Sequence, residues 1–366
     1  MKRGYKSLAL ILWLLFLTPT AFATDIADRS FDIIDGKSVE NAVPDEAREL
    51  LDGAGINQDL DFTSCVKTLF NRAFGAIGEY FKQSLAGGLK LFAVAALCAL
   101  ASGLTDKIQR AVGIAGTLAA TLVAAGDMGS LLGLGRTTLL EIAAFGKVLM
   151  PVLAAAATAS GAVASTSVLY VAVMFAVDML LSLIADIMTP LVWAYIVLLT
   201  AGGITGNEGL NKLAKTLKNG VSCALKIVLG LFVGYLMVGG VISGTTDAMT
   251  VKTVKLAMSS VIPVAGGVIA DAAEAVVAGA GIVRSVAGVF GVLSILAIVI
   301  LPFLRLAIQY VAFRLSALLS AVAGADGLEK VLEGLGEAFS LVLALTGSGA
   351  ALLLIGVFVS AAGVTL

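Results

Sequence analysis

Long apolar runs are the feature that most restricts what this chain can fold into. From Gly87 to the C-terminus, stretches of about 20 residues with few charges follow one another, and that is the length an α-helix needs to cross the hydrocarbon core of a bilayer. Strands of a membrane barrel instead alternate apolar and polar residues over about ten positions. The sequence lacks that alternation, so it predicts an all-α, polytopic transmembrane helical bundle.

The composition excludes an ordinary soluble fold. Of the 366 residues, 59% are hydrophobic and 13% are charged, whereas soluble domains average roughly 45–50% apolar and about 25% charged residues. The chain has too little charge to cover the surface of a soluble protein. Its net charge of −1 gives no electrostatic reason to expect a nucleic-acid partner.

The N-terminus has the layout of a secretory signal peptide. Three basic residues within the first six positions precede the apolar run 8–17, and Ala21 and Ala23 supply the small residues of a cleavage site. We predict a signal peptide over residues 1–23, cleaved after Ala23. An uncleaved signal anchor is the alternative.

Residues 24–86 differ in composition from everything that follows. They contain twelve acidic and six basic residues, and a signal peptide would send them across the membrane. We therefore expect a small, partly helical, acidic extracytoplasmic region. The remaining residues, 87–366, are predicted to form a membrane domain of about nine spans. The candidate spans are 87–104, 111–126, 137–160, 167–187, 190–205, 221–243, 286–304, 306–323 and 340–363.

Prolines and basic residues complete this topology. Pro190 is predicted to break the chain between the fourth and fifth spans, and Pro151 to kink the third. The basic loops 105–110 and 206–220 are expected on the cytoplasmic side. The same count of spans puts the acidic stretch 324–339 on the opposite side, and the last span ends inside.

Small and charged residues within the spans suggest how the helices pack. The spacing of Gly230-xxx-Gly234 and Gly240-xxx-Gly244 predicts close helix packing, either within the bundle or between subunits. For Asp178 and Asp186, pairing with a cation or a place near a span end is favoured over substrate binding. The charged residues that fall within or beside spans include Glu141, Lys147, Asp178, Asp186, Arg284 and Arg305.

Residues 244–285 interrupt the regular pattern of spans. Pro263 and Gly266-Gly267 break an apolar run, so we expect a re-entrant or broken helical segment near 258–285. Asp271 and Glu274 follow at spacing i, i+3 and share one helix face. These two carboxylates either line a polar path or solvate a helix end at the interface.

This segment resembles the stage III sporulation protein AE family, as does the layout of a signal, an acidic segment and a multi-span body. The residues that match the pattern form a hypothetical functional segment: Asp247, Lys252, Lys255, Pro263, Gly266, Gly267, Asp271 and Glu274. The resemblance implies a mother-cell membrane subunit of a channel complex that links the mother cell with the forespore. It also implies partners among other stage III A sporulation membrane proteins and a forespore channel protein.

Three classes of function remain to be compared. The favoured one is a non-enzymatic subunit of a sporulation channel or secretion-like complex, and a free-standing secondary transporter is the alternative. A membrane enzyme is the least favoured, because the sequence has no His, no Gly-x-Ser-x-Gly elbow and no phosphate-binding loop. We therefore expect no catalytic residues, no cofactor and no metal site.

Overall fold

The computed structural model describes residues 36–52, 62–100, 106–159, 164–238, 286–322, 324 and 326–362. Throughout these ranges the regular secondary structure is helical. Six helices are long and apolar enough to cross a membrane. The predicted all-α, polytopic membrane bundle is confirmed.

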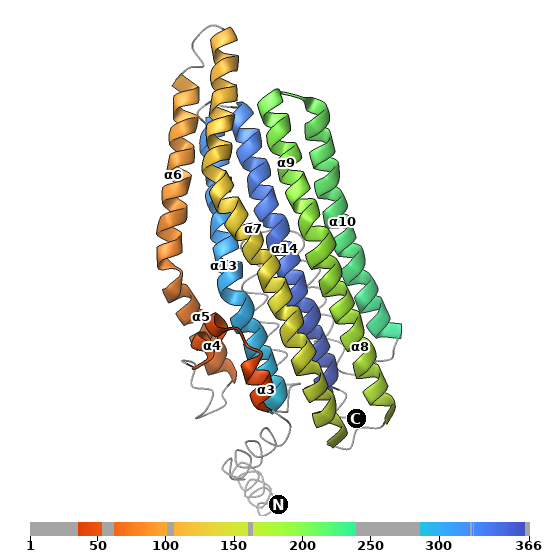
Figure 1. Ribbon diagram of the computed structural model, residues 1–366. Coiled ribbons are helices and arrows are strands. Elements are labelled where there is room, and N and C mark those ends of the chain that lie inside the picture. The colour runs from red at the N-terminus through yellow and green to blue at the C-terminus, as the bar shows by residue number, and fades with distance from the viewer. Residues whose placement is uncertain are drawn as a thin grey trace, which may run out of the picture.

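The helices run side by side along one axis (Figure 1). α14 lies in the middle, where it contacts α13, α7, α8 and α9, while α6 and α10 lie at opposite edges. Three short helices, α3 to α5, gather at one end of the bundle. The elements are α3 (Gly36–Asn41), α4 (Asp45–Asp52), α5 (Phe62–Ala76), α6 (Gly78–Leu100), α7 (Asp106–Ala159), α8 (Ala164–Leu183), the π-helix η2 (Ile184–Met188), α9 (Thr189–Thr205), α10 (Glu208–Val238), α13 (Val286–Val322) and α14 (Asp326–Ala362).

Three pairs of predicted spans form three continuous helical rods. α7 contains 111–126 together with most of 137–160, the run α8–η2–α9 contains 167–187 and 190–205, and α13 contains 286–304 with nearly all of 306–323. The predicted break at Pro190 is wrong, because the helix continues through this residue. Each rod is apolar over more residues than one bilayer crossing requires. For this reason the sequence pattern predicted two spans where the structure has one continuous rod.

The predicted separation of the basic and acidic stretches is also wrong. Lys218 of the 206–220 stretch forms an ion pair with Glu337 of the 324–339 stretch, at 2.7 Å, so both stretches lie at the same end of the bundle. They form the first turns of α10 and α14. The sequence analysis had divided α13 into two spans, which placed one membrane crossing too many between the basic and the acidic stretch. The extra crossing put the acidic stretch on the opposite side of the membrane. Correspondingly, α14 ends at the end of the bundle where α3 and α4 lie, not at the end where α10 begins (Figure 1).

Two glycines allow sharp turns at the end of the bundle where α10 and α14 begin. Gly206 (φ 67°) ends α9 and Gly324 (φ 77°) separates α13 from α14, and both adopt the left-handed conformation that glycine tolerates best. By contrast, a Cβ atom added at Gly230 or Gly234 would meet nothing within 4 Å. Among the described residues, therefore, no neighbouring helix packs closely against Gly230 or Gly234, and packing between subunits through this face stays a prediction. Gly240-xxx-Gly244 lies outside the described residues.

Candidate functional site

The hypothetical functional segment lies outside the described residues. All eight of its members fall between 239 and 285, as does Arg284, and the predicted cleavage site at Ala21 and Ala23 also falls outside the described ranges. The re-entrant segment and the signal peptide stay predictions. The polar contacts that the structure describes lie elsewhere, between the long helices.

Two ion pairs join α7 to the rod formed by α8, η2 and α9. Arg136 Nη2 lies 3.0 Å from Asp186 Oδ1, and Lys147 Nζ lies 3.1 Å from Asp178 Oδ1. The favoured interpretation of these aspartates as partners of cations is confirmed. Both acids are used to hold neighbouring helices together.

Pro190 accounts for the π-helix that carries Asp186. Because proline has no backbone N–H, the carbonyl of Asp186 cannot receive the usual helical hydrogen bond. The backbone N–H of Thr189 instead donates to the carbonyl of Ile184, five residues back, and the Thr189 hydroxyl donates to the same oxygen at 3.2 Å. Residues eight apart in an α-helix differ by about 80° in direction. The wider π-turn reduces that offset, and Asp178 and Asp186 both reach α7.

Replacing Pro190 should remove this alignment. In Pro190→Ala, the restored N–H allows a regular α-helix, which turns Asp186 away from Arg136. We expect cross-linking of cysteines placed at positions 136 and 186 by a short bifunctional thiol reagent to fall several-fold in the Pro190→Ala background. Cysteines at 147 and 178 serve as the control and should cross-link equally well with and without the proline. Equal cross-linking at 136 and 186 would contradict this account.

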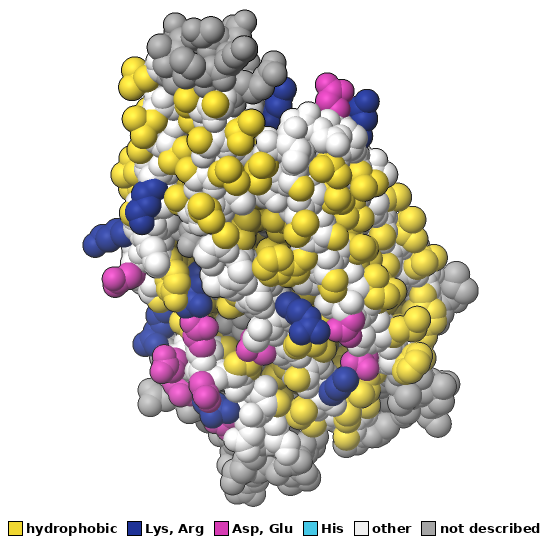
Figure 2. All heavy atoms as spheres, turned by 45° about the horizontal axis from the view of Figure 1, so that its top comes forward, with side chains coloured by type: hydrophobic (Ala, Val, Ile, Leu, Met, Phe, Trp, Pro, Cys, Tyr) yellow, Lys and Arg dark blue, Asp and Glu magenta, His cyan; other side chains and the backbone are white. Residues whose placement is uncertain are grey.

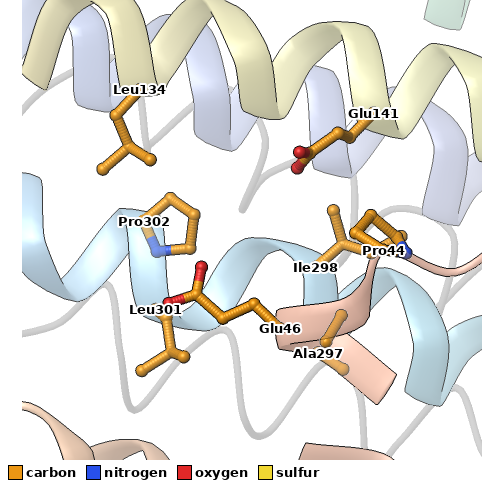
Figure 3. Close-up of a pocket in the computed structure, with 9 residues that line it drawn as sticks. Pro44, Glu46, Leu134, Glu141, Ala297, Ile298, Leu301 and Pro302 are labelled. Atoms are coloured by element: carbon orange, nitrogen blue, oxygen red, sulfur yellow. The ribbon is translucent and has the colours of Figure 1, made fainter. Parts of the chain in front are cut away.

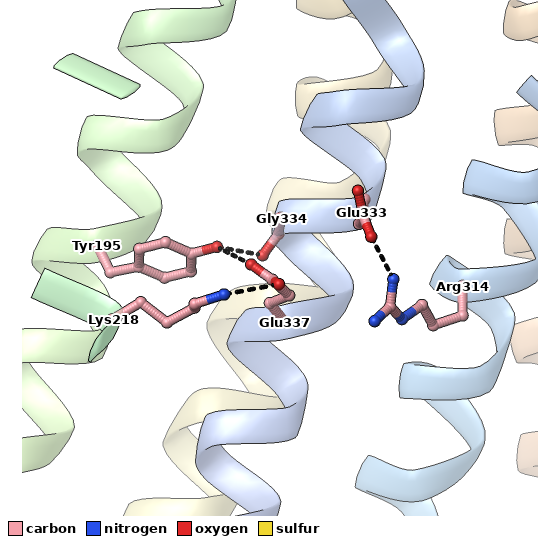
Figure 4. Close-up of polar contacts among 6 residues, drawn as sticks. All are labelled: Tyr195, Lys218, Arg314, Glu333, Gly334 and Glu337. Carbon is pink, nitrogen blue, oxygen red and sulfur yellow. Dashed lines mark hydrogen bonds and ion pairs between the residues drawn. The ribbon is translucent and has the colours of Figure 1, made fainter. Parts of the chain in front are cut away.

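A second polar network joins α9, α10 and α14 (Figure 4). Glu337 of α14 accepts from Lys218 Nζ at 2.7 Å, and the Tyr195 hydroxyl lies 3.2 Å from its other oxygen. The same hydroxyl lies 2.9 Å from the carbonyl oxygen of Gly334. Beside this network, Arg314 of α13 pairs with Glu333 at 2.6 Å. The acidic stretch is therefore a contact region for three neighbouring helices.

Tyr195 is the buried member of this network, with 2% of its surface exposed. Tyr195→Phe should lower the free energy of unfolding in mild detergent by about 1–2 kcal/mol, because a hydrogen bond between a buried hydroxyl and charged or carbonyl acceptors is lost. Tyr235→Phe is the matched control, since Tyr235 is 40% exposed. Equal losses from the two substitutions would show that the Tyr195 hydroxyl contributes nothing specific.

A third contact attaches the N-terminal helices to the bundle. Arg305 of α13 forms an ion pair with Glu46 of α4, and its guanidinium carbon lies 4.1 Å from the centre of the Tyr80 ring. Between Val286 and Phe313 it is the single charged residue of α13, and its side chain is only 15% exposed. Glu46 therefore provides the negative charge that this buried cation needs.

A small pocket lies beside this pair, between α4, α7 and α13 (Figure 3). Glu46 and Glu141 both line it, together with Pro302 and Ile298 of α13. Since Pro302 lacks an N–H, the carbonyl of Ile298 has no α-helical partner there. Within the described ranges, no group of three or more metal-ligating side chains comes together. The contacts found there join helices and pair charges.

The fold and these contacts define a multi-pass α-helical membrane protein whose long helices are held together by ion pairs. The family model for stage III sporulation protein AE matches residues 49–363. The chain belongs to the stage III sporulation protein AE family. Stage III sporulation protein AE of Bacillus subtilis (strain 168) is 27% identical over 177 residues, which cover 48% of this chain and 44% of that relative. No solved structure matches the chain.

Proposed function

We propose that the chain is a non-enzymatic integral membrane subunit of a channel or secretion-like complex that links mother cell and forespore. In this role it is required for forespore development. The observation that carries the proposal is the family match over residues 49–363. The bundle of long apolar helices supports it, because such a body belongs in a membrane.

The proposed location is the mother-cell membrane that faces the forespore, with residues 24–86 extracytoplasmic. The placement of the basic residues of α10 supports this orientation. The basic first turns of α10, with Lys212, Lys215 and Lys218, lie at the end of the bundle opposite α3 and α4 (Figure 1). Basic residues near the ends of spans favour the cytoplasmic side, so α3 and α4 belong on the other side. The proposed partners are other stage III A sporulation membrane proteins and a forespore channel protein.

Isolation of the tagged chain tests the proposal. The full chain carries a C-terminal affinity tag in its own sporulating host, and membranes are solubilised in mild detergent after engulfment. We expect other stage III A membrane proteins to co-purify, and we expect a strain lacking the gene to form engulfed forespores that yield almost no heat-resistant spores. A strain that sporulates normally but loses uptake of a solute would instead identify a secondary transporter.

A further inference from the structure

The two ion pairs between α7 and α8–η2 lie on the outside of the bundle. The side chains of Arg136 and Asp186 are 48% and 58% exposed, and those of Lys147 and Asp178 are 57% and 37% exposed. Ser182, also exposed, lies four residues from each aspartate. We call these five residues the α7–α8 seam.

The seam lies within apolar rods and not at their ends. Residues 148–159 of α7, 164–177 of α8 and 187–205 of η2–α9 contain no charged side chain. Large hydrophobic side chains are exposed on either side of the seam, including Phe175 at 70% and Val197 at 61%. In Figure 2, hydrophobic side chains cover much of the visible face, and basic and acidic side chains gather next to one another in its lower half.

The spacing of the two pairs limits where they lie in a bilayer. Arg136 and Lys147 are eleven residues apart, which is about 16 Å along an α-helix. The hydrocarbon core is about 30 Å thick, so the two pairs cannot occupy the two opposite headgroup layers. If both pairs lay beyond one side of the core, long apolar surfaces next to them would face water. At least one pair therefore lies at the depth of the apolar segments.

A charged side chain that faces acyl chains at this depth is unfavourable. Insertion measurements give about 2.5–3.5 kcal/mol for a single Arg, Lys or Asp at the centre of a spanning helix. Such residues almost always face the interior of the bundle or a water-filled cavity. The seam residues do not face the interior, because about half of their side-chain surface is exposed.

We propose that the α7–α8 seam borders a water-filled path that runs beside this subunit at membrane depth. The inference rests on the proposed function, because neighbouring subunits of the complex must separate such a path from lipid. Two cationic and two anionic side chains line this border, and Ser182 adds a hydroxyl between the aspartates. Water can solvate the exposed parts of these side chains, which acyl chains cannot do.

Cysteine accessibility tests the path directly. In a tagged chain whose Cys65, Cys98 and Cys223 are replaced by serine, and which still supports sporulation, we introduce Ser182→Cys or Ala144→Cys. Ala144 is exposed on α7 between Arg136 and Lys147. Membranes from broken sporulating cells are treated with a charged methanethiosulfonate that does not enter lipid. The control is Leu231→Cys on α10, which is 68% exposed.

We expect the cysteines at 182 and 144 to react at least about ten-fold faster than the cysteine at 231, because only a hydrated thiol ionises to the reactive thiolate. Reaction of positions 182 and 144 as slow as that of 231 would overturn the proposal, whether acyl chains or a tightly packed protein cover the seam. The outcome is separable from that of the tagged isolation. If partners co-purify but both seam cysteines are unreactive, the water-filled path fails alone. If no partner co-purifies, the proposed function fails regardless of the labelling.

Discussion

Glu46→Lys is expected to lower the free energy of unfolding of the bundle by about 2–3 kcal/mol. The substitution removes the negative charge next to Arg305 and places a second cation beside it. The Arg305 side chain is only 15% exposed, so water screens this repulsion poorly. This loss is smaller than that for a fully buried pair because the Glu46 side chain itself is 52% exposed. Chemical unfolding of the full chain in mild detergent measures the effect.

Two further variants identify the ion pair as the cause. Glu49→Lys makes the same charge change on the same short helix at an exposed position, and it should cost less than about 0.5 kcal/mol. Combining Glu46→Lys with Arg305→Glu restores opposite charges and should recover most of the lost stability. If the double variant is as unstable as Glu46→Lys alone, the pair does not attach α4 to α13.

The membrane body of this chain could be predicted because it depends on composition. A chain with few charges and recurring apolar runs needs a lipid environment, and this conclusion does not depend on where the individual helices begin and end. The number of crossings was harder to predict, since several apolar runs are longer than one bilayer crossing. Pro190 illustrates the difficulty. A proline between two apolar stretches favours a break in sequence-based reasoning, yet here the helix continues through a π-turn in which Thr189 bonds to Ile184.

The polar contacts could be predicted only in part. That Asp178 and Asp186 pair with cations followed from the cost of an isolated charge among apolar residues. The identity of the two cations could not be predicted in this way. Arg136 and Lys147 come from another helix, and the register between the two helices depends on packing. The network around Glu337 was missed. Lys218 and Glu337 are 119 residues apart, and helix periodicity indicates a face but not the helix that covers it.

Glycine spacing alone did not identify the close contacts between the described helices, for a related reason. The small-residue motif indicated Gly230 and Gly234, but no described residue lies within 4 Å of a Cβ atom added there, so a role in contacts between subunits stays a prediction. Gly203 has no such motif, yet an added Cβ atom there would lie 2.4 Å from Val331 and 3.4 Å from Thr117. A close approach depends on three helices meeting, here α9, α14 and α7, which no local pattern records.

Gly203→Leu should therefore destabilise the bundle strongly, by about 1–3 kcal/mol or more, because the side chain has no space between α9, α14 and α7. Unfolding of the full chain in mild detergent measures the loss. Gly220→Leu is the matched control, since it introduces the same side chain at an exposed helical glycine with nothing within 4 Å of the added Cβ atom. Replacing a helical glycine by leucine also favours the helix itself, so the control should be neutral or slightly stabilising. Equal stability of the two variants would mean that α9 does not pack closely against α14 at Gly203.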